Sequence, residues 1–356
     1  MTLRVVEPDP VETAAQALSD VERECELDTW GHDDLWAPPN VWQAILAPTA
    51  DDRHRVLVAV RDGADEPSPA GVAHLHLPVS ANQHLAHLRV LVRPGSRHRG
   101  VGSELIAAAE RVLADEGREV VISYVASSPE PPAGPGALEP PTGTGRVPAD
   151  TSSTRFALGH GFELEQVCRQ SVLTVPDDLS AVVAAREAAL AVAGDDYRLH
   201  VWHDEIPRMW WPGMADLMGR FMTDAPTADL AYDDVPWDTA RVERWLATYA
   251  DRHQHLTVTA AEHVPTGILA GFTELMYPVP EVPFAFQNET LVRADHRGRR
   301  LGMAVKAQNL VAVRERRPGL RRVHTDNAEE NAHMLAINVA LGFAPAGVRA
   351  ALQKKL

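Results

Sequence analysis

The segment VRPGSRHRGVG, residues 92–102, recurs as VRADHRGRRLG at residues 292–302 with a constant offset of 200. Each copy follows an extended apolar stretch and precedes a segment whose apolar residues recur with helical spacing. The flanking stretches are residues 87–92 and 103–116 for the first copy, and 286–292 and 303–314 for the second. The repeat therefore predicts the same strand, loop and helix unit twice in one chain.

The similarity between the halves continues beyond the loops. Each half reaches Gly-Phe, at residues 161–162 and 342–343, and then an alternating segment that predicts closing strands, residues 166–174 and 348–356. The first half is longer here because it contains a Pro/Gly-rich insertion near residues 129–148, which we interpret as a mobile surface loop. We expect a domain at 1–178, a linker at 179–196 and a second domain at 197–356.

The other patterns indicate the fold class. Helical spacing is found at residues 11–26, 179–192, 208–222 and 240–250, and strand patterns at 55–61, 70–77, 255–261 and 267–276. Helices followed by a mainly antiparallel sheet, interrupted by strand-loop-helix units, predict an α/β (α+β) protein. We expect two domains, each a central, mostly antiparallel mixed sheet flanked by helices, because 356 residues exceed the usual size of one core.

Composition and charge limit the possible partners. With 45% hydrophobic and 23% charged residues the chain has a globular composition, and its net charge of −15 argues against nucleic-acid or anionic-membrane binding. Two cysteines, Cys25 and Cys168, are too few for a disulfide framework or a cysteine zinc site. The sequence has neither a signal-peptide pattern nor a membrane-spanning stretch, so we expect a cytoplasmic protein.

The repeated loop has the features of an anion site. Backbone N–H groups that follow a strand and open a helix attract negative charge, and small residues allow close approach. Arg97 and Arg99 in one copy, and Arg297, Arg299 and Arg300 in the other, add charges that can pair with phosphate oxygens. A solvated basic turn is the alternative for a single copy, but recurrence favours a phosphate site. The pattern is neither a P-loop nor a dinucleotide-binding GxGxxG motif.

These residues resemble a known family. Arg97-x-x-Gly100-x-Gly102, preceded by Val92-x-Pro94, resembles the acetyl-CoA pyrophosphate loop and fourth strand of GNAT-superfamily N-acetyltransferases. The second copy keeps Arg297 and Gly302 but has Arg300 in place of the middle glycine. The segment 325–343 is similar to the strand-five, helix-four and Gly-Phe segment of the same superfamily. Tandem GNAT proteins, mycothiol synthase among them, are known.

The resemblance implies a binding mode for acetyl-CoA as acetyl donor. The molecule would lie between the fourth and fifth strands, with its pyrophosphate on the loop and its thioester carbonyl near a backbone N–H of Leu91, Val92, Leu291 or Val292. No metal is implied. The cofactor-binding residues that it implies in the first half are Val92, Arg97, His98, Arg99, Gly100, Val101 and Gly102. Those in the second half are Leu291, Val292, Arg293, Arg297, Gly298, Arg299, Arg300, Leu301, Gly302, Asn327 and Asn331.

Direct attack of an amine on the thioester needs a base that removes a proton from the ammonium group. Glu289 lies on the predicted fourth strand of the second half, whereas the matching residue of the first half is Arg89. We assign Glu289 as the catalytic base; an ordinary exposed strand residue is the alternative interpretation. Asp326 and Glu274 are weaker candidates. We therefore favour the second half as catalytic, with the first shaping the acceptor pocket or binding CoA structurally.

The general acid is not identified. Many family members have a tyrosine four residues before the glycine of Gly-Phe, where this chain has Ala157 and Asn338. The thiolate would then be protonated by water or by another residue. The absence of this phenol also leaves room for a copy that binds CoA without turning it over.

Three further features are interpreted as structural. His74, His76, His84 and His87 lack the accompanying pattern of a zinc site, so we interpret them as surface histidines. The methionines at 214, 218 and 222, beside Trp210 and Trp211, suit an apolar acceptor pocket, but such a stripe is more often core. The acidic residues Asp224, Asp229, Asp233 and Asp234 are interpreted as a solvated loop, the alternative being attraction of a cationic amine.

The sequence as a whole predicts an acetyl-CoA-dependent N-acetyltransferase. It would move an acetyl group to a primary amine of a small molecule by direct attack in a ternary complex. It would act as a monomer or a homodimer, without nucleic-acid or membrane partners. A non-catalytic, regulatory CoA-binding tandem module and a mycothiol synthase-like enzyme are the alternatives.

Overall fold

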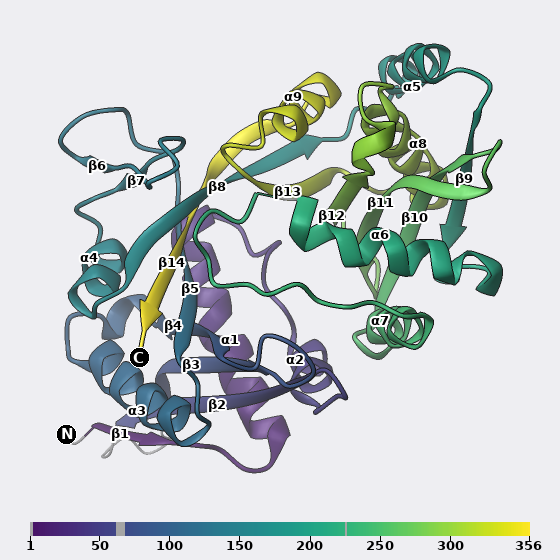
Figure 1. The fold of residues 1–356 in the computed structure, drawn as a ribbon. Coiled ribbons are helices and arrows are strands. Elements are labelled where there is room, and N and C mark those ends of the chain that lie inside the picture. The colour runs from purple at the N-terminus through teal and green to yellow at the C-terminus, as the bar shows by residue number, and fades with distance from the viewer. Residues whose placement is uncertain (1–2, 62–67, 225) are drawn as a thin grey trace. The chain divides into compact units, whose positions relative to one another are not determined.

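The computed structural model describes residues 3–61, 68–224 and 226–356, apart from the side chains of 222–224. The chain forms two compact units (Figure 1). Unit 1 consists of residues 1–167, 228–233 and 347–356, and unit 2 of residues 168–227 and 234–346. Both have the predicted α/β class, with helices on a mixed sheet.

Unit 1 is built on a mixed sheet in the order β1-β2-β3-β4-β5-β14. Neighbouring strands are antiparallel except β4 and β5, which run parallel. The strands are β1 (Leu3–Val6), β2 (Asp52–Arg61), β3 (Pro69–Pro78), β4 (Leu85–Val92), β5 (Val120–Ser127) and the part of β14 (Ala344–Lys355) that belongs to this unit. The helices are α1 (Val11–Trp30), α2 (Pro39–Leu46), η1 (Pro94–Ser96), α3 (Val101–Asp115) and α4 (Ser152–Gly159).

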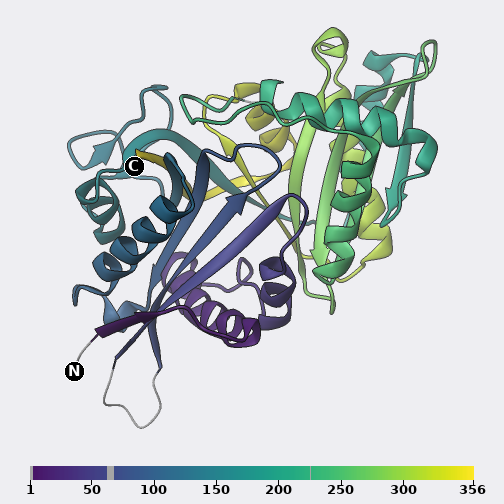
Figure 2. The same ribbon diagram turned by 60° about the horizontal axis from the view of Figure 1, so that its bottom comes forward.

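Helices α1 and α3 cover opposite faces of the unit 1 sheet (Figure 2). Side chains alternate between the two faces of a strand, and the two cores follow this alternation. On β2, Val56 and Val58 pack with the apolar face of α1, whereas Leu57 and Ala59 pack with α3. Both faces of β2 are thus buried, which explains its continuous apolar run.

Unit 2 repeats this plan in the order β8-β13-β12-β11-β10-β9, and β12 and β13 are its parallel pair. The strands are β8 (Glu163–Thr174), from Cys168 onward, β9 (Tyr197–His203), β10 (Gln254–His263), β11 (Ile268–Pro278), β12 (Phe284–Val292) and β13 (Arg322–Ala328). The helices are α5 (Ser180–Ala193), η2 (Arg208–Trp210), α6 (Trp211–Asp224), α7 (Thr239–Asp251), η3 (Ala294–His296), α8 (Leu301–Arg316) and α9 (Ala332–Leu341).

The two faces of the unit 2 sheet are also covered. Helices α6 and α7 pack on Val258 and Phe272, and α8 packs on Ala261 and Leu275. Met214 and Met218 of α6 are buried in the first of these cores, as the structural interpretation predicts, and the side chain of Met222 lies outside the described residues.

The units exchange strands. Residues 348–355 of β14 pair antiparallel with residues 120–127 of β5 in unit 1, and residues 168–174 of β8 pair antiparallel with β13 in unit 2. The segment 228–233 also belongs to unit 1, where Leu230 packs on Leu85, Val120 and Ile122. The units therefore do not coincide with the continuous segments 1–178 and 197–356, because a closing strand can pair with a sheet from either half. The stretch expected as a linker, 179–196, contains α5, which packs on α8 of unit 2.

The insertion near 129–148 is folded, which corrects its interpretation as a mobile surface loop. It contains the antiparallel pair β6 (Ala137–Leu138) and β7 (Val147–Pro148). Val147 is buried in the core of unit 1, and Arg146 donates to the Pro131 carbonyl and pairs with Glu130. The Pro and Gly content therefore reflects tight turns within a packed hairpin.

No helix in the described part of the chain combines the length and apolarity needed to cross a bilayer.

Candidate functional site

Each unit has an opening between its two parallel strands. The pairing of β4 with β5 covers Leu85 to His87 against Val120 to Ile122, and that of β12 with β13 covers Phe284 to Phe286 against Arg322 to His324. Beyond these three positions the strands of each pair are not paired. The later residues of β4 and β12 therefore present backbone groups to the opening.

The loops after β4 and β12 have the same backbone conformation but reach it with different residues. In unit 1, His98 and Gly100 adopt left-handed conformations, with φ of +57° and +79°. In unit 2, Gly298 and Arg300 do so at the equivalent positions, with φ of +80° and +56°. A non-glycine residue in this region costs about 1–2 kcal/mol. Arg300 therefore does not change the shape of the loop; the glycine has moved to position 298.

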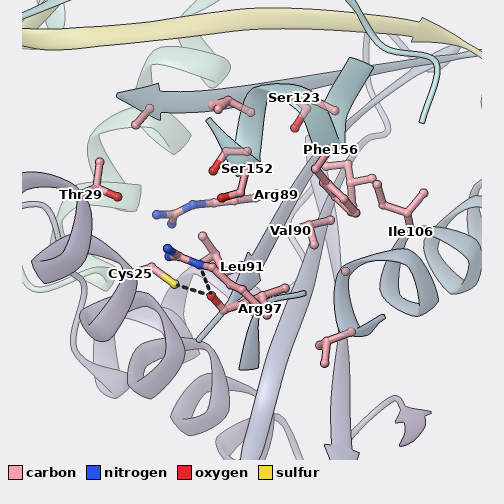
Figure 3. Close-up of a pocket in the computed structure, with 18 of the residues that line it drawn as sticks. Cys25, Thr29, Arg89, Val90, Leu91, Arg97, Ile106, Ser123, Ser152 and Phe156 are labelled. Carbon is pink, nitrogen blue, oxygen red and sulfur yellow. Dashed lines mark hydrogen bonds between the residues drawn. The ribbon is translucent and has the colours of Figure 1, made fainter. Parts of the chain in front are cut away.

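The arginines that open the two loops have a structural role. Arg97 Nε donates to the Val92 carbonyl at 3.2 Å, and Arg297 Nε donates to the Val292 carbonyl at the same distance. Arg97 also forms an ion pair with Asp28 of α1 at 2.6 Å. Figure 3 shows Arg97 and Cys25 directed to one oxygen, the Val92 carbonyl, which Cys25 Sγ approaches to 3.5 Å. These arginines close the loop and can offer only their remaining N–H groups to a phosphate.

A pocket of about 300 Å³ occupies the opening of unit 1 (Figure 3). It is lined by the end of β4, by the loop and first turn of α3, by β5 and by α4. Seven residues of this half are predicted to bind the cofactor, and six of them line the pocket: Val92, Arg97, His98, Gly100, Val101 and Gly102. The seventh, Arg99, is not among the lining residues. The first-turn N–H groups of α3 have no partners within the helix and are available to an anion. The pocket therefore joins a helix N-terminus to the open edge of β4, an arrangement suited to a ligand that carries phosphate.

The last glycine of each loop lies close to a neighbouring helix. A Cβ atom on Gly102 would lie 2.8 Å from the ring of Phe156 on α4, and one on Gly302 would lie 3.0 Å from the end of Ile337 on α9. Each glycine thus lets a helix approach the start of α3 or α8. The contact is tighter in unit 1, where it involves a rigid ring.

Strand β12 has a bulge that β4 lacks. Thr273 lies opposite Thr290 and Leu275 lies opposite Gln287, so Glu274 faces two residues, Asn288 and Glu289. The register of β3 with β4 is regular from Gly71–Val92 to His76–His87. A bulge re-aims side chains and leaves backbone groups unpaired, and bulges are frequent beside active sites. The bulge places Glu289 next to Glu274.

Glu274 belongs to a hydrogen-bonded chain with Asn288 and Tyr249. Asn288 Nδ2 donates to Tyr249 Oη at 3.4 Å, and Tyr249 Oη donates to Glu274 Oε1 at 3.0 Å. Burial, followed by the charge and hydrogen bonding of Glu289, raises the pKa of Glu274 well above its ordinary value. The raised pKa favours the protonated form of Glu274, whose carboxyl lies beside Glu289. Glu289 itself is half-buried.

Replacing Glu274 by Gln should stabilise the protein at alkaline pH. Because the pKa of Glu274 is raised on folding, the unfolded chain loses this proton first, and stability falls as pH rises from the ordinary value through the raised one. Gln keeps an acceptor for Tyr249 and a donor for Glu289 without titrating. We expect a Tm about 2–4 °C above wild type at pH 8, corresponding to about 1 kcal/mol, and no gain near pH 4. Thermal melts across this range test it, and a pH-independent difference would contradict it.

The corresponding part of unit 1 is an ion-pair cluster. Arg89 occupies the region of β4 that corresponds to the bulge and binds Glu22 and Glu26, one helical turn apart on α1, with a distance of 2.6 Å to Glu26 Oε1. Glu22 Oε2 also accepts from Trp42 Nε1 at 2.8 Å. Unit 2 has the carboxylate of Glu289 on its strand, whereas unit 1 has Arg89 there and the carboxylates of Glu22 and Glu26 on the covering helix α1.

The other predicted residues of unit 2 have identifiable contacts. Asn331 caps α9 by accepting from the Met334 N–H, and Asn327 accepts from Asn338 Nδ2 at 2.6 Å. Arg293 forms ion pairs with Asp216 and Asp295, and Arg299 lies over the ring of Tyr197. Asp326, a weaker base candidate, is exposed. Asn331 and Arg293 therefore have structural roles whether or not they also bind a cofactor.

Three of the four histidines set aside above form part of an aromatic column, which corrects their interpretation as surface residues. Adjacent rings stack from His74 through His54 and His76 to His87, which packs on Tyr232. Burial lowers the pKa of His74 well below its usual value and that of His87 to about 4, so both are neutral at pH 7. Among the described residues, no group of three or more His, Cys, Asp or Glu side chains could hold a metal ion.

Sequence reasoning missed Glu22, Glu26 and Tyr249. A signal existed for the first two, because both share the face of α1 that carries Leu18 and Cys25, and charged residues on an apolar helix face are unusual. No pattern marked Tyr249, because its partner Glu274 lies on another element.

Comparisons with known proteins agree with this architecture. Residues 15–133 match the acetyltransferase (GNAT) family. A solved tandem GNAT protein from the clavulanic acid biosynthesis pathway is similar at 22% identity and a TM-score of 0.74, over 99% of this chain and 98% of that one. A GCN5-related N-acetyltransferase from Sphaerobacter thermophilus is similar at 13% identity and a TM-score of 0.66, over 99% and 95%. No curated protein matches the sequence significantly.

The family match lies within unit 1, and the shared fold extends over both units. The matched residues 15–133 include β4, the loop after it and α3, which carry the predicted motif. The chain therefore contains a GNAT acetyltransferase domain, is an acyltransferase, and has the fold of a tandem GNAT protein.

Proposed function

We propose that the protein is an acetyl-CoA-dependent N-acetyltransferase that acetylates a primary amine of a small molecule, with Glu289 of unit 2 as the base. The observation that carries this proposal is the buried pair of Glu274 and Glu289 at the bulge of β12, beside the opening between β12 and β13. A base at this place faces the position where a thioester in the opening would meet an acceptor.

The loop and the opening support acetyl-CoA as the donor. The unit 1 pocket is lined by the loop and by the first turn of α3, and the loop of unit 2 repeats the backbone conformation of unit 1 through Gly298 and Arg300. The pyrophosphate would lie on the N–H groups at the start of α3 and α8, and the thioester would lie along β4 or β12. We propose that both units bind acetyl-CoA.

Glu289 would take one proton from the acceptor ammonium. Glu274 lies beside Glu289, and Tyr249 holds Glu274 in place by a hydrogen bond to its Oε1. The free amine attacks the thioester carbonyl carbon, whose oxygen would accept a hydrogen bond from a backbone N–H near Leu291 or Val292. Asn338 is buried and bonded to Asn327, so the second proton released from nitrogen would reach the thiolate through water.

An assay with acetyl-CoA and a panel of primary amines tests the proposal. Release of CoA thiol, followed with a thiol reagent, should depend on the amine, and the acetylated amine should be found by mass spectrometry. The panel should include amino sugars, polyamines and simple aryl alkylamines. Tight acetyl-CoA binding without transfer to any of them would favour the non-catalytic binding module.

A further inference from the structure

A second pocket of unit 1, of about 410 Å³, adjoins the pocket proposed to bind acetyl-CoA. Glu26, Trp30 and Arg89 are among the residues that line both, so the two spaces meet at the end of α1. His74, His76 and His87 form one wall, and Arg349 of β14 reaches the same space. The volume suits a ligand of the size of an amino acid.

Glu26 lies at the junction of the two pockets with an unused acceptor atom. Its side chain belongs to a residue that is only 7% exposed, and Oε1 accepts from Arg89 at 2.6 Å. Oε2 is buried and has no hydrogen-bond partner of ordinary geometry. Burial raises the pKa of the Glu26 carboxyl, although the neighbouring charges of Arg89 and Arg349 and the Trp30 indole act in the opposite direction. Such a carboxyl has the chemistry of a general base.

The charges around this pocket cancel. Glu22 and Glu26 carry two negative charges, and Arg89 and Arg349 carry two positive charges. His74 and His87 of the histidine wall add none, because burial keeps both neutral at pH 7. A simple ammonium or a simple carboxylate would introduce an uncompensated charge, which is costly in a partly buried site. A ligand with one ammonium and one carboxylate group would leave the net charge of the pocket unchanged.

We infer that the histidine-walled pocket is a second acyl-acceptor site, for an amine that also carries a carboxylate, with Glu26 as its base and Arg349 as the partner of the carboxylate. This inference rests on the acetyl-CoA chemistry of the proposed function, but it uses unit 1 and not Glu289. The amino group would lie against the Glu26 carboxyl, since Glu26 lines both pockets.

The step balances without a further reactant. The ammonium gives one proton to Glu26, and the freed nitrogen lone pair forms a bond to the carbonyl carbon of acetyl-CoA. The C–S bond breaks, and the thiolate takes up a second proton from nitrogen. Glu26 then returns its proton to water, so that the products are the amide, CoA thiol and one released proton.

The experiment uses the full chain with Glu289→Gln, which removes the base of unit 2. Its substrates are matched pairs that differ in the carboxylate: phenylalanine with phenethylamine, tryptophan with tryptamine, and leucine with 3-methylbutylamine. We expect this variant to acetylate the amino acid of at least one pair about 10-fold faster than the amine. Adding Glu26→Gln should lower kcat about 100-fold with an unchanged KM for acetyl-CoA. Adding Arg349→Met instead should raise KM for the amino acid only.

Asp20→Asn is the matched control, because it is the same kind of change at an exposed position of α1. It should leave the rate of the Glu289→Gln protein unaltered, and melting curves check that each variant is folded. The inference is overturned if the Glu289→Gln protein acetylates no amino acid, if it prefers the decarboxylated amines, or if Glu26→Gln has no effect. If Glu289→Gln does not slow wild-type transfer, the proposed role of Glu289 fails while this inference stands.

Discussion

Glu289→Gln is expected to lower kcat/KM for acetylation of the preferred amine by about 10²–10⁴-fold, with little change in acetyl-CoA affinity. The amide has the size of the carboxylate and can still accept from Glu274, but it cannot remove a proton. The loss should be smaller above the pKa of the acceptor amine, because free amine is then already present. Steady-state kinetics from pH 6 to 10 and acetyl-CoA titrations measure these effects.

Glu315→Gln provides the control, since Glu315 is exposed on α8 away from β12. It should behave as wild type. Activity of the Glu289→Gln protein within twofold of wild type at neutral pH would remove Glu289 from the role of base. Glu274 would not replace it, because its raised pKa makes it a proton donor.

Acetyl-CoA titrated into the wild-type protein should bind at two sites, and Gly102→Asp and Gly302→Asp should each remove one of them. A carboxylate introduced in the first turn of α3 or α8 would repel the pyrophosphate and weaken binding about 100-fold, or by about 2.7 kcal/mol. The substitution at 102 also forces the ring of Phe156 away from its position in the pocket, since the added Cβ would lie 2.8 Å from it. Calorimetry gives the stoichiometry directly.

Alanine variants separate charge from volume. Gly302→Ala meets only the flexible end of Ile337 and should keep both sites, whereas Gly102→Ala meets a ring and should weaken one. A single wild-type site that survives Gly302→Asp would show that unit 2 does not bind acetyl-CoA, and would contradict catalysis there. The absence of any binding would contradict the proposed donor itself.

Local sequence patterns predict most of the longer helices and strands. The repeat at 92–102 and 292–302 identified the loops and the helices that follow, because its spacing of glycines and arginines is set by the backbone of the loop itself. Helix α1 was predicted to 26 and continues to Trp30, where Gly31 ends it in a left-handed conformation with φ of +76°. The short strands β1 and β9 were missed, since four to seven residues at a sheet edge carry little periodic signal.

The partners of these elements were harder to predict. The alternation in β8 and β14 predicts strands but does not determine the strands with which they pair, so the exchange could not be derived from sequence. The sequence placed Glu289 on the fourth strand, but the bulge that joins it to Glu274 depends on the register with β11. Glu26 was missed because its position results from the packing of α1 on β4, through Arg89.

The exchange of strands has a consequence for how the chain is made and inherited. Strand β5 gains its second neighbour, beside β4, only after residues 348–355 have left the ribosome, so unit 1 has an open sheet edge during the synthesis of most of unit 2. A gene split between the halves would leave each product with a strand that belongs to the other. Although the two halves resemble a duplication, each needs a strand from the other half to complete its sheet.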